Sequence, residues 1–237
     1  MSVRVLTGTS GYSYPEWKGS FYPEKFAAKG MLRYYAERFP TVEINNTFYR
    51  MPTEALMRGW AEQVPDTFSF AFKATKRITH DRRLRDCADA VEYLVRTAST
   101  LGPRLGPLLF QLPPNFKKDL PRLTEFLATL PDGPRYAFEF RHASWFDDDV
   151  FQALRTCRVA LCVADTGEEP VTPFVATAGW GYLRLRREDF GDDELRDWAR
   201  RILEQPWSDA YVFLKHEEEG RGPKLAARLM DFCREFA

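Results

Sequence analysis

The chain lacks an excess of charge of either sign, and it lacks long apolar runs. Its 237 residues carry 34 basic and 34 acidic side chains, so the formal net charge is zero. A neutral balance gives no global attraction to nucleic acid or membrane, although a local basic patch is compatible with it. No stretch approaches the ~18 uninterrupted apolar residues of a membrane-spanning helix. The sequence predicts no membrane partner and leaves the oligomeric state open.

Cysteine is scarce, and no flexible linker divides the chain. The four cysteines form neither a CxxC pair nor the close spacing of a small secreted disulfide framework. This favours reduced thiols and a cytoplasmic location. Because no Gly/Ser-rich or low-complexity segment interrupts the sequence, we expect a single domain over residues 1–237.

Short apolar runs alternate with longer amphipathic segments, a pattern that is typical of βα units. The runs predict strands near 3–7, 42–45, 68–73, 107–111, 136–140, 159–163, 181–186 and 210–215. The amphipathic segments predict helices near 29–38, 53–63, 86–101, 119–129, 147–156, 192–204 and 222–236. This order fits an α/β fold of the (β/α)8 TIM-barrel type, with an open doubly wound sheet as the alternative. Pro170, Pro173 and Gly179 predict an irregular sixth βα unit.

Several predicted strands end in polar or charged residues. In a parallel barrel these ends converge on the C-terminal mouth, where active sites are built. Residues two apart in a strand share a face, so Glu43 points the same way as Asn45, and Glu139 the same way as Arg141. The same alternation groups Tyr182, Arg184 and Arg186. Buried charges must neutralise one another or hold a ligand.

These side chains give a candidate site. We expect Arg141, Arg184 and Lys73 to hold an anion, since guanidinium groups bind carboxylates and phosphates bidentately. The predicted general base is a carboxylate assisted by a histidine, and the candidates are Glu139, Glu43, His142 and His80. Other predicted substrate-binding residues are polar or aromatic: Asn45, Gln111, Tyr12, Trp17, Trp145 and Lys215. The structural alternative is a self-satisfied ion-pair network of Glu43, Glu139, Lys73, Arg141 and Arg184.

Two further features leave alternatives open. All three histidines follow predicted strands, and with nearby carboxylates they are candidate ligands of a divalent metal ion: His80, His142, His216, Glu43, Glu139, Asp165 and Glu217. No HxH or HExxH spacing supports a metal, which favours hydrogen-bonding or acid–base histidines instead. The aromatic connection from Thr9 to Ala28 would offer stacking surface to a sugar or base, or else form a satellite core.

The chain also resembles a known family. The motifs are Glu-Ile-Asn-Asn-Thr-Phe-Tyr at 43–49, Gln-Leu-Pro-Pro at 111–114 and Glu-Phe-Arg-His-Ala-Ser-Trp at 139–145. They resemble the YecE-like proteins, the family called domain of unknown function 72 (DUF72), over nearly the whole chain. The resemblance implies a TIM-type barrel and no settled reaction.

Three functional hypotheses follow. The first is an enzyme of the hydrolase or isomerase type, with acid–base and optionally metal-assisted chemistry, acting on a small anionic, phosphorylated or sugar-like substrate at the barrel mouth. The second is a non-catalytic module that grips a nucleotide or single-stranded nucleic acid. The third is a purely structural or scaffold role.

Overall fold

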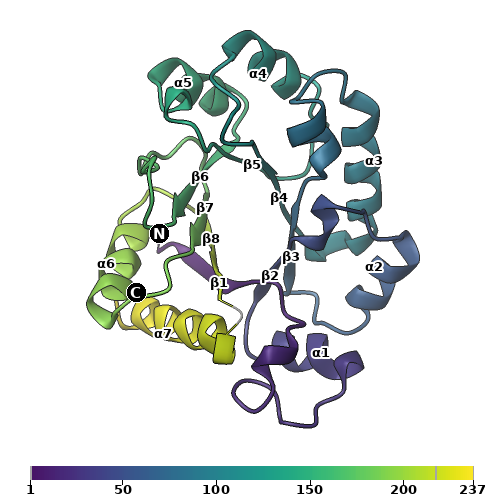
Figure 1. Ribbon diagram of the computed structural model, residues 1–237, viewed down its shortest axis with the longest axis vertical. Helices are drawn as coiled ribbons and strands as arrows, with labels where there is room; N and C mark the ends of the chain where they lie inside the picture. The colour runs from purple at the N-terminus through teal and green to yellow at the C-terminus, as the bar shows by residue number, and fades with distance from the viewer. Residues whose placement is uncertain (1, 217, 237) are drawn as a thin grey trace.

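Eight parallel strands form a closed barrel with helices around it (Figure 1). The computed structural model describes residues 2–216 and 218–236. The strands are β1 Arg4–Ser10, β2 Thr41–Ile44, β3 Ser69–Lys73, β4 Leu105–Gln111, β5 Tyr136–Glu139, β6 Ala160–Asp165, β7 Gly181–Leu185 and β8 Asp209–Leu214. The α-helices are α1 Met31–Ala36, α2 Glu54–Ala61, α3 Ala88–Ala98, α4 Leu120–Leu127, α5 Asp148–Thr156, α6 Asp192–Leu203 and α7 Arg221–Phe236.

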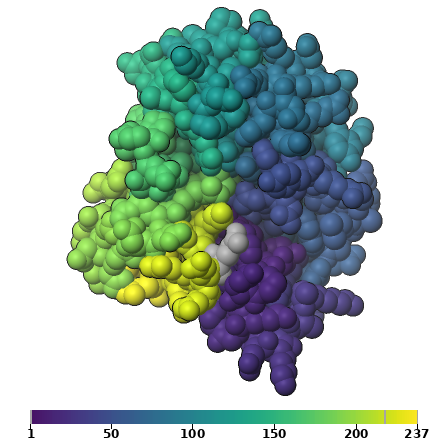
Figure 2. Space-filling view, in the orientation of Figure 1, coloured from purple at the N-terminus to yellow at the C-terminus, as the bar shows by residue number. Residues whose placement is uncertain are grey.

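The barrel closes through its first and last strands. β1 pairs in parallel with β8 from Arg4 opposite Asp209 to Thr9 opposite Leu214, and it pairs with β2 on its other side. Figures 1 and 2 show the other end of the chain close by, with α7 lying beside the N-terminal segment. The predicted TIM-type barrel is therefore confirmed, and the open doubly wound sheet is wrong.

Helix starts follow from local hydrogen bonding. The Thr53 hydroxyl accepts the Leu56 N–H at 3.3 Å at the start of α2. At the start of α4 the Asp119 carboxylate accepts the Arg122 N–H at 3.2 Å. Such caps satisfy backbone N–H groups that have no partner within the helix. They explain why both helices begin where the sequence predicts.

Strand alternation builds two apolar layers. Side chains that point outward, such as Val42, Phe72 and Phe138, join the large core under the helices. Side chains that point inward, such as Leu6, Leu109 and Phe213, fill the barrel interior. The interior is thus packed rather than open, as in other barrels of this type. Polar side chains on the inward face lie at both ends of the barrel. Arg4 pairs with Asp209 at the N-terminal end. The larger buried network, around Arg184, lies at the C-terminal end, where sites of such barrels are built.

The sixth βα unit is irregular, as predicted. Residues 166–180, all of which the structure describes, contain no helix. Thr177 anchors the segment, because its hydroxyl donates to the Val159 carbonyl and accepts the Leu161 N–H, both at 2.7 Å. Phe174 packs edge-on against Trp207 at 5.7 Å between centroids. Side-chain contacts therefore replace a helix on this side of the barrel.

None of the helices in residues 2–216 and 218–236 combines the length and apolar character needed to cross a membrane.

Candidate functional site

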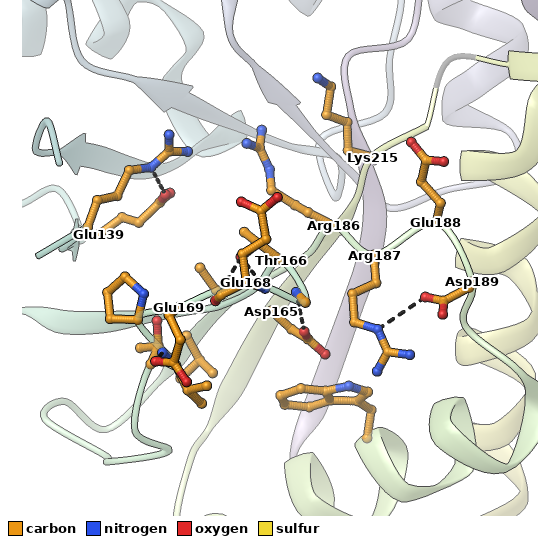
Figure 3. Close-up of a pocket in the computed structure, with 18 of the residues that line it drawn as sticks. Glu139, Asp165, Thr166, Glu168, Glu169, Arg186, Arg187, Glu188, Asp189 and Lys215 are labelled. Atoms are coloured by element: carbon orange, nitrogen blue, oxygen red, sulfur yellow. Dashed lines mark hydrogen bonds and ion pairs between the residues drawn. The ribbon is translucent and has the colours of Figure 1, made fainter. Parts of the chain in front are cut away.

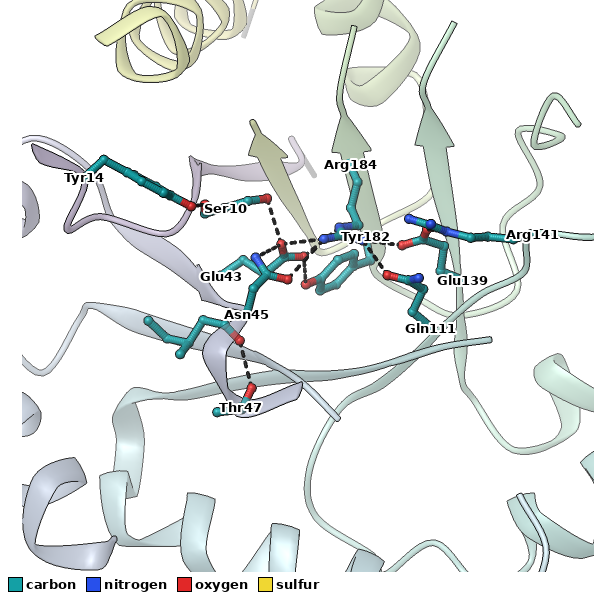
Figure 4. Close-up of polar contacts among 11 residues, drawn as sticks. Ser10, Tyr14, Glu43, Asn45, Thr47, Gln111, Glu139, Arg141, Tyr182 and Arg184 are labelled. Carbon is teal, nitrogen blue, oxygen red and sulfur yellow. Dashed lines mark hydrogen bonds and ion pairs between the residues drawn. The ribbon is translucent and has the colours of Figure 1, made fainter. Parts of the chain in front are cut away.

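Arg184 on β7 lies between two buried carboxylates at the C-terminal end of the barrel (Figure 4). Its Nη1 donates to Glu139 Oε2 at 2.5 Å, and its Nη2 donates to Glu43 Oε2 at 2.9 Å. All three side chains are at most 1% exposed. Burial would raise the pKa of both carboxyls, but Arg184 lowers the pKa of Glu43 and, with Arg141, lowers the pKa of Glu139 to about 2. Both carboxylates are therefore ionised at neutral pH.

Glu43 is enclosed by donors from the protein. Its Oε2 accepts the Ser10 hydroxyl at 2.7 Å and the Asn45 amide at 2.8 Å, and its Oε1 accepts the Tyr182 hydroxyl at 2.8 Å. Asn45 Oδ1 in turn accepts from Arg184 at 3.2 Å. The predicted shared face of Glu43 and Asn45 is confirmed. With no exposed surface, Glu43 is placed to hold Arg184.

Glu139 is the carboxylate of the pair that reaches a cavity. Its Oε1 accepts Arg141 Nε at 2.8 Å, while Gln111 Oε1 accepts from Arg184 at 3.3 Å. We call this set the mouth network: Ser10, Glu43, Asn45, Gln111, Glu139, Arg141, Tyr182 and Arg184. It contains four of the five residues of the structural alternative, since Lys73 makes no ion pair with it among the described residues.

A cavity of about 1300 Å³ opens beside the mouth network (Figure 3). Glu139 and Arg141 form one side of it, and the predicted substrate residue Lys215 also lines it. Other walls come from the end of β6 and the segment after it, 163–172, from the segment 186–189 after β7, and from Trp198 and Arg201 of α6. The wall after β6 is not apparent from the sequence, because an irregular segment has no periodicity from which its position follows.

Arg186 lies one residue beyond β7 and lines this cavity. Its Nε is buried and has no hydrogen-bond partner among the residues that the structure describes. Its neighbour Arg187, by contrast, pairs with Asp189 at 3.2 Å and Glu194 at 2.7 Å. Burial and the nearby Arg184 charge lower the pKa of Arg186. Arg186 is not among the site residues predicted from the sequence. Strand alternation does place Arg186 on the same strand face as Arg184, and this spacing of two residues could have identified it.

Lys73 and His80 meet on one aromatic ring. Lys73 Nζ lies 3.9 Å from the centroid of Phe48, and the His80 ring meets Phe48 edge-on at 4.8 Å. His80 belongs to a π-helical turn, Arg77–Asp81, a form that often occurs at functional sites. Burial, reinforced by Arg184, lowers the pKa of Lys73 to about 8, and burial with Lys73 lowers the pKa of His80.

Two predicted aromatic residues are core residues instead of cavity residues. Trp145 is fully buried, and its indole N–H donates to the Phe116 carbonyl at 2.6 Å. Trp17 is 1% exposed and packs against Phe21 and Tyr22. Tertiary packing covers both rings, so Trp17 offers no stacking surface and Trp145 does not line the cavity as a substrate-binding residue.

Two other predicted residues also have local partners. Tyr12 is half-buried and packs near Tyr35, with centroids 6.2 Å apart, so the rings of the first connection join the large core under the helices and form no separate satellite core among the described residues. His142 Nδ1 accepts the Ser144 N–H at 3.1 Å and begins the short turn Ala143–Trp145. The structure thus gives Tyr12 and His142 roles in local packing and capping.

Over the described ranges, no group of three or more His, Cys, Asp or Glu side chains is arranged to hold a metal ion. His80 packs on Phe48, His142 caps a turn, and His216 Nε2 bonds the Arg187 carbonyl at 2.6 Å. The three histidines therefore do not converge. Glu217, another candidate ligand, lies outside the described residues.

Fold and site together define a (β/α)8-barrel protein with a buried ion-pair network and a polar cavity at its C-terminal mouth. The family described as protein of unknown function DUF72 matches residues 6–236, and the chain belongs to this family.

Relatives support this assignment. YunF of Bacillus subtilis strain 168 is 31% identical over 242 residues, covering 85% of this chain and 86% of YunF. YecE of Escherichia coli K12 is 35% identical over 145 residues, which cover 60% of this chain and only about half of YecE. A solved DUF72 protein of Thermotoga maritima superposes with a TM-score of 0.85 at 26% identity, covering 98% of this chain and 99% of that one. D-psicose 3-epimerase of Clostridium cellulolyticum, at a TM-score of 0.59 and 12% identity, shares the fold alone.

Replacing Glu43 tests the buried pair. We expect Glu43→Gln to lower the free energy of unfolding by about 3–5 kcal/mol, because Arg184 loses one of its two buried counter-charges. The matched control is Glu54→Gln, which breaks the exposed ion pair with Arg58 and should cost about 0.5 kcal/mol or less. Urea unfolding measures both variants. Equal losses in the two variants would show that burial of the network adds nothing.

The depressed pKa of Glu139 predicts a pH dependence. Its folded pKa is about 2 against an ordinary 4.5, so the unfolded chain takes up the proton first as the pH falls. The stabilisation is complete above the unfolded pKa and is lost as the pH falls towards the folded pKa, amounting to about 3 kcal/mol. The difference in unfolding free energy between wild type and Glu139→Gln should shrink between about pH 6 and about pH 3. A difference that stays constant over this range would contradict the assignment.

Proposed function

We propose that this protein is an enzyme of the hydrolase or isomerase type whose substrate is a small anionic, phosphorylated or sugar-like molecule bound in the mouth cavity. The observation that carries the proposal is Arg186, a half-buried cation beside a network that is already neutral. Within that network the charges of Glu43 and Glu139 balance those of Arg141 and Arg184. Arg186 therefore adds a positive charge that no described residue pairs with.

A substrate anion would supply the missing counter-charge. A cation withdrawn from water costs free energy unless it is paired, and the guanidinium fork matches carboxylate and phosphate oxygens. In Figure 3 the Arg186 and Lys215 side chains point in the same direction across the cavity. The two positive groups thus favour an anion at the part of the cavity lined by Arg186 and Lys215.

The segment after β6, the strand next to β7, favours hydroxyl groups. Glu168 and Glu169, from the segment after β6, also line the cavity and are exposed. Carboxylates repel a phosphate but accept hydrogen bonds from sugar hydroxyls. The wall charges therefore suit a molecule with its anionic group at Arg186 and a polyhydroxylated part towards the β6 segment.

Glu139 is the carboxylate best placed for proton transfer, because it lines the cavity whereas Glu43 is enclosed. With a pKa of about 2 it is a weak base in the free protein. A bound anion near Arg141 would offset the positive field and raise that pKa, which makes Glu139 a stronger base when substrate is present. His80 remains the predicted assisting histidine, and its lowered pKa favours the neutral imidazole.

The nucleic-acid alternative is less well supported by these contacts. Its grip depended on exposed rings in the first connection, but Trp17 is buried and Tyr12 and Tyr14 are half-buried. The neutral mouth network also removes most of the positive charge on which a polyanion would depend.

Arg186 and Arg187 offer a matched pair of variants. We expect Arg186→Gln to weaken binding of inorganic pyrophosphate by about tenfold or more, because a charge-assisted hydrogen bond contributes about 1.5–3 kcal/mol. Arg187→Gln should leave binding nearly unchanged, since Asp189 and Glu194 already neutralise Arg187. Isothermal titration calorimetry measures both.

Two outcomes would count against the proposal. Equal weakening in both variants would indicate attraction by general surface charge. Tighter binding of a thymidine oligonucleotide than of pyrophosphate, with a steep loss on adding salt, would instead support the nucleic-acid alternative.

A further inference from the structure

Lys73 is an amine at the barrel mouth with no carboxylate partner among the described residues. It is the last residue of β3, and its side chain is half-buried. Its Nζ lies over the face of Phe48, 3.9 Å from the centroid. An aromatic face stabilises a buried cation less than a carboxylate partner does. The environment of Lys73 therefore does little to favour its charged form.

Charged groups from several elements act on this amine. Glu43 on β2 and Glu139 on β5 would favour the ammonium, but both are already bound to Arg184. Arg184 on β7 and Arg141 after β5 disfavour it. Desolvation is the largest influence, and together these effects lower the pKa of Lys73 to about 8.

His80, from the turn after β3, is a titratable group that also contacts Phe48, edge-on with the ring centroids 4.8 Å apart. Its lowered pKa favours the neutral imidazole, which can accept a proton and pass it on. The mouth thus combines an amine, a proton carrier and neighbouring cations. Lysines placed near other cations in this way are activated nucleophiles in other enzymes.

We propose that the Lys73 amine is a catalytic nucleophile that forms an imine with a small phosphorylated aldehyde or ketone. The proposal rests on the function proposed above and assigns its substrate class. With a pKa of about 8, about a tenth of the Lys73 side chains carry the neutral amine at pH 7. Arg141 lines the cavity, and its positive charge lowers the pKa of Lys73. Lys73 is therefore close enough to the cavity to feel the charge of one of its lining residues.

The steps balance in atoms and charge. The amine lone pair forms the N–C bond while the carbonyl π electrons move to oxygen, and His80 carries a proton from nitrogen to that oxygen. The nitrogen lone pair then expels the hydroxyl, which takes one more proton and leaves as water. In sum, a carbonyl and a lysine ammonium give a protonated imine and one water. The cationic imine draws electrons from the adjacent carbon, whose proton Glu139 is placed to accept in an isomerisation.

Competitive labelling of wild-type protein tests the amine directly. Cyanate reacts with the neutral amine, and mass spectrometry of peptides gives the labelling rate at each lysine. We expect the Lys73 rate to reach half its plateau near pH 8. Lys76, exposed and three residues away, is the reference for accessibility in the same molecule. A Lys73 labelling rate that still rises above about pH 10, or no labelling at Lys73, would overturn the proposal.

Reductive trapping tests the imine. Protein incubated with dihydroxyacetone phosphate and sodium borohydride should gain one adduct per chain, mapped to Lys73 and lost in Lys73→Arg. Lys76→Arg should keep the adduct. Adducts spread over surface lysines and unchanged in Lys73→Arg would refute imine formation. If pyrophosphate still binds and Arg186→Gln still weakens it while no adduct forms at Lys73, the imine is wrong and the anion-binding function stands.

Discussion

The arrangement of the barrel mouth depends on the Arg184 guanidinium and its two carboxylates. Glu43 and Glu139 come from strands three positions apart in the ring, and the cation from β7 joins them. A buried ion pair contributes little net stability, since desolvation offsets its Coulomb energy. Its loss is costly, however, because one charge then remains unpaired. The ion pairs of Arg184 with Glu43 and Glu139 therefore fix the relative positions of β2, β5 and β7. The side chains that follow these strands are held in place as a consequence.

A neutral network changes what the next side chains experience. Arg186 and Lys73 lie near Arg184, but the carboxylates that might have balanced them are already engaged. Burial and the positive charge of Arg184 therefore lower the pKa of both Arg186 and Lys73. The same positive charges attract an anion that enters the cavity. An incoming anion relieves the repulsion among these charges. The same contacts that make the network self-sufficient thus leave the outer cations dependent on a ligand.

Much of this arrangement follows from the sequence, because strand alternation has a period of two. Alternation by itself puts Glu43 on one strand face with Asn45, and Arg184 on one face with Arg186. It does not show that Arg184 bonds a residue 141 positions away, since such pairing depends on barrel closure. Nor does it show that Trp145 is buried: an aromatic residue in a loop looks the same whether it lines a site or packs in a core.

Depth along the barrel axis separates the two kinds of polar residue at the mouth. Arg184 lies within β7 and is neutralised by protein, whereas Arg186, two residues further, lies beyond the strand and lacks a partner for its Nε among the described residues. On β5 the same step leads from buried Glu139 to half-buried Arg141. Charges at the deeper level are withdrawn from water, so they must be paired within the fold whether or not a ligand is bound. At the outer level, cations are available to a ligand. On β5 and β7, the cations available to a ligand therefore lie two residues beyond the last buried charge, on the same face of the strand.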